Sequence, residues 1–236
     1  MRQTNKIRKG IAWLLCTVLV LGILPMLPQM SMQISAAENA ASVFVDGVEL
    51  HAGGKKYFKN GDTADSGATG TDEDHSAYYD TAGELWLNNL EAHTIKANGN
   101  LTIYVCNNQE TNTNIVTATQ NETAIEVTGY LTIQYGGYGE TGSLTVESDG
   151  KEAIQAGSGM TVSDGVEVKA RAKSGATAIS SGGVLKIDGI RTKLEAAGDG
   201  STGKGIFAQQ SIYVKNSAVL TAFGGEIGRA SCRERV

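Results

Sequence analysis

The sequence is poor in proline and cysteine, and this scarcity limits how the chain can be stabilised. Only two prolines occur in 236 residues, Pro25 and Pro28, and both lie near the N-terminus. Of three cysteines, only Cys106 lies in residues 38–225, so no disulfide can form within that segment. The segment must therefore be held together by burial of apolar side chains and by hydrogen bonds.

Basic residues are also scarce. Residues 38–225 carry 13 Lys and Arg against 23 Asp and Glu, a formal net charge of −10. This balance argues against nucleic acid, whose binding needs a basic footprint, and against an anionic membrane surface. The three histidines are isolated, and neither His-x-x-His nor Cys-x-x-Cys occurs, so the sequence gives no support for a zinc site.

The N-terminus has the order of a secretory signal peptide. Four basic residues precede an apolar run from Ile11 to Leu27, and small residues follow up to Ala37. We therefore expect residues 1–37 to be removed during export, with no membrane insertion of the mature chain. An uncleaved anchor is the alternative, but the run is short for a bilayer span of roughly 20 residues.

The last eleven residues, 226–236, break the preceding pattern with three arginines and a cysteine. Ile227 to Val236 can be back-translated into a common sequencing adapter. We interpret the segment as an artefact and expect the natural chain to continue past Gly225, so that this chain is C-terminally truncated. A basic tail that binds anions is the alternative interpretation.

One short phrase recurs five times between these ends, beginning at residues 94, 124, 153, 178 and 205. Each copy has three apolar positions, and the last two are separated by one residue, which is typical of a strand with one buried face. The resulting apolar columns are Ile95, Ile125, Ile154, Ile179 and Ile206; Leu101, Leu131, Met160, Leu185 and Ile212; and Ile103, Ile133, Val162, Ile187 and Val214.

A further strand separates the copies, at residues 116–118, 146–148, 168–170, 194–196 and 220–222. Aligning these segments places Glu147, Lys169 and Glu195 in one outward column. Three short strands per repeat of 25–30 residues, joined by Gly, Asn and Ser, predict an all-β parallel β-helix, or β-solenoid. An immunoglobulin-like sandwich is the alternative, but its strands do not recur in a fixed triplet.

The front of the mature chain has a different pattern. Asp46-Gly47, between alternating apolar residues, predicts a hairpin, and Leu85 and Leu87 around Trp86 predict an early coil strand. We assign residues 38–93 to an N-terminal cap with the first coil, and residues 94–225 to the repeats, because a solenoid must cover its apolar end.

Tyrosines and aspartates are the candidate binding residues. Sugars stack on exposed aromatic rings, and Tyr130, Tyr135, Tyr138 and Tyr104 surround a glycine-rich corner. The alternative is that these rings only cover coil corners. A loop holds Asp62, Asp65, Asp72 and Asp74, which are candidate calcium ligands because calcium takes about 6–8 oxygen ligands. A solvated acidic loop is the alternative there.

Catalysis is the runner-up function. The expected columns gather carboxylates and lysines, with Asp188 near Lys186 and Lys215, as a polysaccharide lyase or a glycoside hydrolase would require. Outward charge ladders bring such groups together for structural reasons alone, and no cleft-forming insertion accompanies them. We therefore expect no enzymatic activity.

The run YYDTAGELWLNNL at 78–90, followed by LTI-type and AI-type strands with glycine corners, resembles the secreted carbohydrate-binding-domain family of Firmicutes, especially clostridia. The similarity covers residues 43–225. It implies a right-handed β-helix of pectate-lyase type that binds polysaccharide or cell-wall glycan, often with calcium. We expect a non-catalytic carbohydrate-binding or adhesin-type protein, secreted or at the cell wall of a Gram-positive bacterium. A structural spacer of a larger surface protein is a further alternative.

Overall fold

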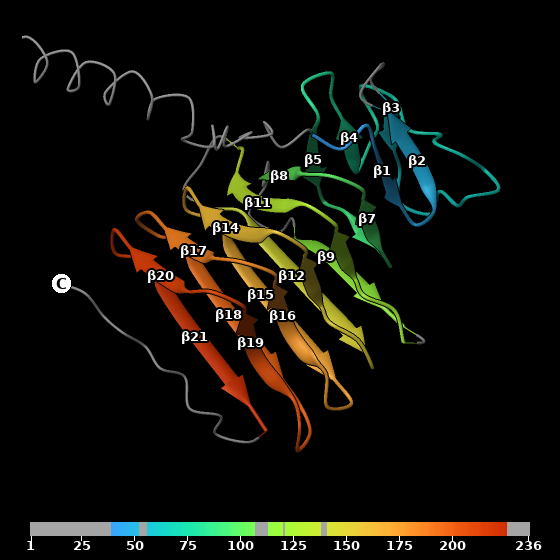
Figure 1. Ribbon diagram of the computed structural model, residues 1–236. Coiled ribbons are helices and arrows are strands. Elements are labelled where there is room, and N and C mark those ends of the chain that lie inside the picture. Colours follow the sequence, from blue (N-terminus) through green and yellow to red (C-terminus); the bar gives the residue numbers. More distant parts are fainter. Residues whose placement is uncertain (1–38, 52–55, 107–112, 120, 138–140, 226–236) are drawn as a thin grey trace, which may run out of the picture. The chain divides into compact units, whose positions relative to one another are not determined.

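The computed structural model describes most of the chain between the two ends, all within one compact unit. Every regular element of these residues is a β-strand (Figure 1). The expected leader, the segment 226–236 and Tyr138 lie outside the described residues. The described ranges are 39–51, 56–106, 113–119, 121–137 and 141–225.

The strands form three sheets. The seven-stranded sheet contains β2 (Val48–His51), β1 (Ser42–Val45), β7 (Ile95–Ala97), β10 (Ile125–Val127), β13 (Ile154–Ala156), β16 (Thr177–Ser181) and β19 (Lys204–Ala208). The eight-stranded sheet contains β3 (Lys56–Phe58), β4 (Ala77–Tyr79), β5 (Glu84–Asn88), β8 (Leu101–Cys106), β11 (Tyr130–Tyr135), β14 (Gly159–Ser163), β17 (Leu185–Asp188) and β20 (Ile212–Lys215). The six-stranded sheet contains β6 (Glu91–Ala92), β9 (Asn114–Ala118), β12 (Ser143–Asp149), β15 (Glu167–Lys173), β18 (Lys193–Gly198) and β21 (Val219–Gly224).

From β5 onward the chain visits the eight-, six- and seven-stranded sheets in turn. Five successive triplets, from β5–β7 to β17–β19, make five coils, and each strand pairs in parallel with its counterparts in neighbouring coils, as from β8 through β11 to β14. Figure 1 shows the coils following one another in colour order. The predicted all-β parallel β-helix with three short strands per coil is confirmed.

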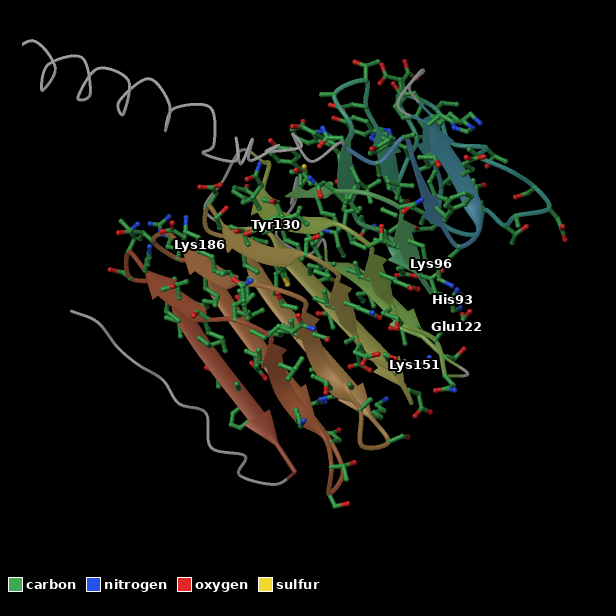
Figure 2. All side chains as sticks on the ribbon, viewed as in Figure 1. His93, Lys96, Glu122, Tyr130, Lys151 and Lys186 are labelled. Carbon is green, nitrogen blue, oxygen red and sulfur yellow. The ribbon has the colours of Figure 1, made fainter. Side chains whose placement is uncertain are left out.

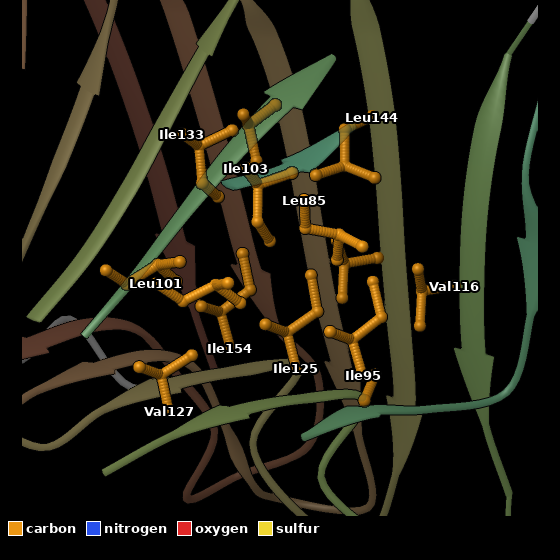
Figure 3. Packing of buried hydrophobic residues seen from close by; sticks show 14 of the residues in the cluster. Leu85, Ile95, Leu101, Ile103, Val116, Ile125, Val127, Ile133, Leu144 and Ile154 are labelled. Atoms are coloured by element: carbon orange, nitrogen blue, oxygen red, sulfur yellow. The ribbon is translucent and has the colours of Figure 1, made fainter. Parts of the chain in front are cut away.

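The apolar columns fill the interior as predicted. Ile133 pairs in register with Ile103 on one side and Val162 on the other, and all three side chains are fully buried. Figure 3 shows Ile103 and Ile133 among other buried side chains of the core, including Leu85, Val116 and Leu144. Because truncation of such a side chain to alanine typically costs about 2–5 kcal/mol, these columns are the main source of stability.

The register expected for the six-stranded sheet is wrong at one step. Val168 pairs with Leu144 and not with Val146, so the partner of Glu147 is Arg171, and Lys169 lies opposite Thr145. A shift of two residues leaves every side chain on its original face, so the apolar pattern is satisfied by either alignment. The Lys169–Glu195 neighbourhood is confirmed, but Glu147 does not belong to that column.

Glycines set how closely the coils approach at the corner between the seven- and eight-stranded sheets. A Cβ on Gly182 would lie 1.8 Å from the carbonyl oxygen of Gly157, and a Cβ on Gly157 would lie 2.1 Å from that of Thr128. Both contacts are with backbone, which cannot move without displacing a coil. Only glycine therefore allows successive corners to stack at strand spacing.

The N-terminal end of the β-helix is covered. Asp46 and Gly47, with φ of 50° and 77°, form the tight turn between β1 and β2, and β1 adds antiparallel to β7. Strands β3, β4 and β5 are also antiparallel neighbours. Phe58 and Tyr79 fill the interior there, and the Tyr79 hydroxyl donates a hydrogen bond to the carbonyl of Ala40 at 2.5 Å.

The opposite end is open in the described part of the chain. Strands β19, β20 and β21 are terminal in their sheets. Ile212 and Val214 are 38% and 46% exposed, whereas their column neighbours Leu185 and Ile187 are fully buried. No further coil covers these ladder residues among the positions that the structure describes.

Candidate functional site

The outer face of the eight-stranded sheet carries two columns of outward side chains. Successive side chains of a strand point to opposite faces of the sheet, and Leu131, Ile133 and their counterparts face the core, so the residues between them point outward. The register defines the first column as Tyr57, Tyr78, Trp86, Tyr104, Gln134, Ser163, Asp188 and Lys215. It defines the second as Glu84, Thr102, Thr132, Thr161, Lys186 and Tyr213. We call this surface the eight-stranded face.

Aromatic rings stack along the first column. The Trp86 and Tyr104 rings are 4.2 Å apart at 12°, and the Tyr78 and Trp86 rings are 5.9 Å apart at 3°. Tyr57 and His75 extend the cluster at one end, each with its ring centroid within 6 Å of Tyr78. Both faces of Trp86 are therefore occupied by its neighbours, and its indole Nε1 is buried without a hydrogen-bond partner in the described part of the chain. Gly136 packs closely against the Trp86 and Tyr104 side chains. Stacked aromatic pairs contribute roughly 0.5–1.5 kcal/mol each beyond burial.

Two carboxylates flank the aromatic rings. The Tyr104 hydroxyl donates to Glu84 at 3.4 Å, and Asp80 accepts hydrogen bonds from the backbone of Ala82 and of Glu84. Burial, and then the charge of Asp80, raises the pKa of Glu84 from its usual value. Burial, and then the charge of Glu84, likewise raises the pKa of Tyr104. This end of the face therefore favours hydrogen-bond donors over anions.

The middle of the face is uncharged. The Thr102 and Thr132 hydroxyls have no hydrogen-bond partner among the described residues, so both are free to bond a ligand. The next residue of that column, Thr161, shares a hydrogen bond of 2.7 Å with the Tyr130 hydroxyl. Together with Gln134 and Ser163, these side chains form a band of hydroxyl and amide groups.

Beyond this band the face carries an ion pair, and Lys215 follows one strand further along the first column. Lys186 and Asp188 form an ion pair at 2.6 Å, and Asn216 donates to the other oxygen of Asp188 at 2.6 Å. The carboxylate and its hydrogen bond raise the pKa of Lys186, and the ammonium lowers that of Asp188. Figure 2 shows Lys186 on the same side of the molecule as Tyr130, away from Lys96 and Glu122.

The tyrosines predicted to bind sugar differ in their orientation. Tyr104 points outward and pairs in register with Gln134, and Tyr130 points outward with its ring over Gly159. The expectation that Tyr135 is exposed is wrong, because it is two residues after Ile133 and so faces inward, half-buried against the core. Its hydroxyl is buried without a hydrogen-bond partner, and burial raises its pKa. Tyr138 lies outside the described residues.

Three of the four predicted calcium ligands bond neighbouring protein groups. Asp62 is buried and accepts hydrogen bonds from the backbone of Lys59 and Thr69, both at 2.9 Å. Burial acts to raise the pKa of Asp62, but these bonds and that from the Thr69 hydroxyl outweigh it, and the pKa is lowered. Asp72 accepts from Tyr57 at 2.7 Å.

Of the other two carboxylates, Asp74 pairs with Lys59, and Asp65 is exposed. No group of three acidic, histidine or cysteine side chains converges on a metal position in the described ranges. The calcium site stays a prediction, without support from this geometry.

A second feature lies on the outer face of the six-stranded sheet. A shallow hollow of about 120 Å³ is lined by Glu147, Lys169, Arg171 and Glu195 around Ala197. Lys169 also pairs with Glu167 at 3.2 Å, and Glu147 with Lys173 at 3.5 Å. These are the outward charge pairs of a β-ladder, and the hollow exists because Ala197 is the small member of its column.

Sequence reasoning did not assign Trp86, Tyr78, Glu84, Thr102 or Thr132 to a site. The alternation of side chains around Leu85 and Leu87 already places Trp86 outward, so the outward orientation of Trp86 could have been predicted from the sequence. The stacking of Trp86 on Tyr104 follows from the parallel pairing of β5 with β8. The addition of Tyr57 and Tyr78 could not be predicted, because β3 and β4 join the sheet antiparallel, outside the repeat that defines the columns.

No helix that could cross a membrane is found among the residues that the structure describes. Comparison of the chain with models of protein families, with curated proteins and with solved structures gave no match.

Proposed function

We propose that this protein is a secreted, non-catalytic carbohydrate-binding protein of adhesin type, and that it binds polysaccharide through the eight-stranded face. One observation carries the proposal: the outer side of the eight-stranded sheet places free threonine hydroxyls, an amide and phenol hydroxyls beside an aromatic strip. Glycans present hydroxyls that need hydrogen-bond partners and C–H groups that pack on aromatic carbon.

The detail of contact differs from ring stacking on a lone tyrosine. Trp86 has both faces covered and its Nε1 buried, so we expect a sugar to meet the neighbouring tyrosines Tyr78 and Tyr104 and not the indole. Thr102 and Thr132 then supply donors and acceptors that cost no internal hydrogen bond when they bind ligand. The expected leader and the family resemblance support a location outside the cell, with cell-wall glycan or polysaccharide as the partner.

The test is retention of the purified protein on insoluble cellulose, chitin, xylan and peptidoglycan. Thr132→Val removes one free hydroxyl while it keeps the side-chain shape and the strand preference. Thr117→Val is the matched control, because Thr117 is also half-buried, outward and without a hydrogen-bond partner, but lies on β9 of the six-stranded sheet. We expect the first variant to weaken retention and the second to leave it unchanged.

Two further arms separate the alternatives. Release of reducing or unsaturated sugar ends would show a glycoside hydrolase or lyase, and the proposal of a non-catalytic role would then be abandoned. A chelator arm tests calcium: loss of retention that added calcium restores would establish a calcium requirement. Absence of retention on every polysaccharide would refute the proposal and favour a structural spacer.

A further inference from the structure

The register of the eight-stranded face gives a bound glycan a direction. The two outward columns run across the strands, along the axis of the β-helix. The first passes from aromatic to uncharged polar to ion-paired residues, and the second passes from Glu84 through three threonines to Lys186. From Trp86 to Asp188 the first column crosses four strand spacings, about 19 Å at roughly 4.8 Å each. Along any one strand, by contrast, only two or three side chains face outward before the chain turns into a corner.

The charges around this path indicate what kind of glycan it accepts. At the aromatic end stand Asp80 and Glu84, which repel carboxylate and phosphate groups. At the other end Lys186 is already paired with Asp188, so its ammonium is not free to hold an anion, and Lys215 lies beyond Asp188, over the Tyr213 ring at 5.3 Å and outside the path from Trp86 to Asp188. Recognition of an anionic group requires an available Arg or Lys, and the path between these ends has none.

The free hydroxyls lie on the same line. Thr102 and Thr132 are adjacent members of the second column, and neither hydroxyl has a partner among the described residues. They stand one strand spacing apart, so a chain lying along the axis can bond both with successive sugars. A chain lying along β11 would instead meet Tyr130, Thr132 and Gln134 and would leave Thr102 untouched.

We propose that the ligand of this face is an extended, uncharged polysaccharide whose chain lies parallel to the β-helix axis. This inference rests on the proposed function and specifies both its ligand class and the ligand's direction. If one sugar occupies each strand spacing of about 4.8 Å, the path from Trp86 to Asp188 takes about four sugars.

Titration calorimetry with linear oligosaccharides tests the proposal. The neutral probe is a series of β-1,4-linked glucose oligomers of two to eight sugars, and the anionic probe is galacturonate oligomers of the same lengths. We expect affinity for the neutral series to rise up to about four or five sugars and then to level off. We expect the galacturonate series to bind at least tenfold more weakly.

Single-hydroxyl variants then report the direction. Loss of one neutral hydrogen bond corresponds to roughly a three- to tenfold weaker affinity, so Thr102→Val and Thr132→Val should each show this loss, and Thr117→Val should not. Circular dichroism on all three variants verifies that the fold is retained.

The outcomes separate this inference from the proposed function. If Thr132→Val weakens binding and Thr102→Val does not, the chain lies along the strand and the proposed direction is wrong. If galacturonate oligomers bind as tightly as the neutral ones, or if two sugars bind as tightly as five, the ligand class or the extended path is wrong. If neither oligomers nor polymers bind the wild-type protein, the proposed function fails and this inference fails with it.

Discussion

A pair of valines in one interior column gives a direct test of how burial stabilises this β-helix. Val162 and Val214 occupy the same column, two coils apart, with Ile187 between them. Val162 is fully buried, whereas Val214 is 46% exposed. The same substitution, valine to alanine, therefore removes the same atoms from a covered and from an open position.

The expected costs can be worked from these exposures. Valine to alanine removes two carbon groups, worth about 0.8 kcal/mol each when fully buried, or about 1.6 kcal/mol in total. At position 162 the cavity that remains adds to this, so we expect Val162→Ala to lose about 2–3 kcal/mol. At position 214 roughly half of the transfer free energy remains and no closed cavity forms, so we expect a loss below about 1 kcal/mol.

Urea unfolding followed by circular dichroism measures the two losses, and hydrogen exchange reports whether the last coil opens separately, as solenoids allow. The wild-type protein and both variants should be compared at the same concentration, because self-association would cover the open end. Equal losses for the two variants would refute the reasoning, since position 214 would then be as well covered as position 162.

Three further predictions concern single side chains. Tyr135→Phe removes a buried hydroxyl that has no partner, so the urea midpoint should stay the same or rise, with a gain of up to about 1 kcal/mol; a clear loss would mean that the hydroxyl is bonded. Asn114→Ala should cost about 2–4 kcal/mol in the same measurement, because this buried side chain accepts from Leu90 N at 3.0 Å and donates to the carbonyls of Cys106 and Ser143, both at 3.3 Å; a loss below 1 kcal/mol would contradict that role. Glu84→Gln should stabilise the fold at pH 7, because the pKa of Glu84 is raised in the folded state and its ionised form therefore costs stability. The wild type regains this stability as pH falls through the raised pKa. Urea midpoints of wild type and variant that differ equally at pH 7 and below pH 4 would contradict this.

Sequence reasoning predicted the fold because the repeat encodes it. The columns of Ile125, Leu131 and Ile133 could be aligned without gaps, and their parallel partners followed. The register of the six-stranded sheet was less determined, because β12 holds apolar residues at both 144 and 146. Either alignment buries them, and only the backbone pairing distinguishes the two.

The candidate site was harder to predict, for two physical reasons. Tyr135 is two residues after the inward Ile133 on the same strand, so the alternation of side chains along the strand places its ring inward. Extending this alternation past the third apolar column would have predicted that orientation. The part of the aromatic strip beyond Trp86, in contrast, depends on β3 and β4, whose antiparallel pairing brings Tyr57 and Tyr78 beside Trp86 from outside the repeat. Long-range pairings of this kind leave no periodic signal in the sequence.

The two sides of each strand in the eight-stranded sheet are under different constraints, and this indicates where function can be located. The two paired interior columns hold aliphatic residues or methionine in every coil from β8 to β20, because each side chain must fit the column above and below it. Outward positions have no such neighbour to satisfy, and along the first column they change from aromatic to amide and hydroxyl to ion pair. Uncharged groups that are free to bond a ligand occur in the middle of the eight-stranded face, at Thr102 and Thr132, and not at its aromatic or ion-paired end. A ligand-binding role for this face must therefore depend on the coils next to the cap, and replacing outward residues of β20 should leave binding intact.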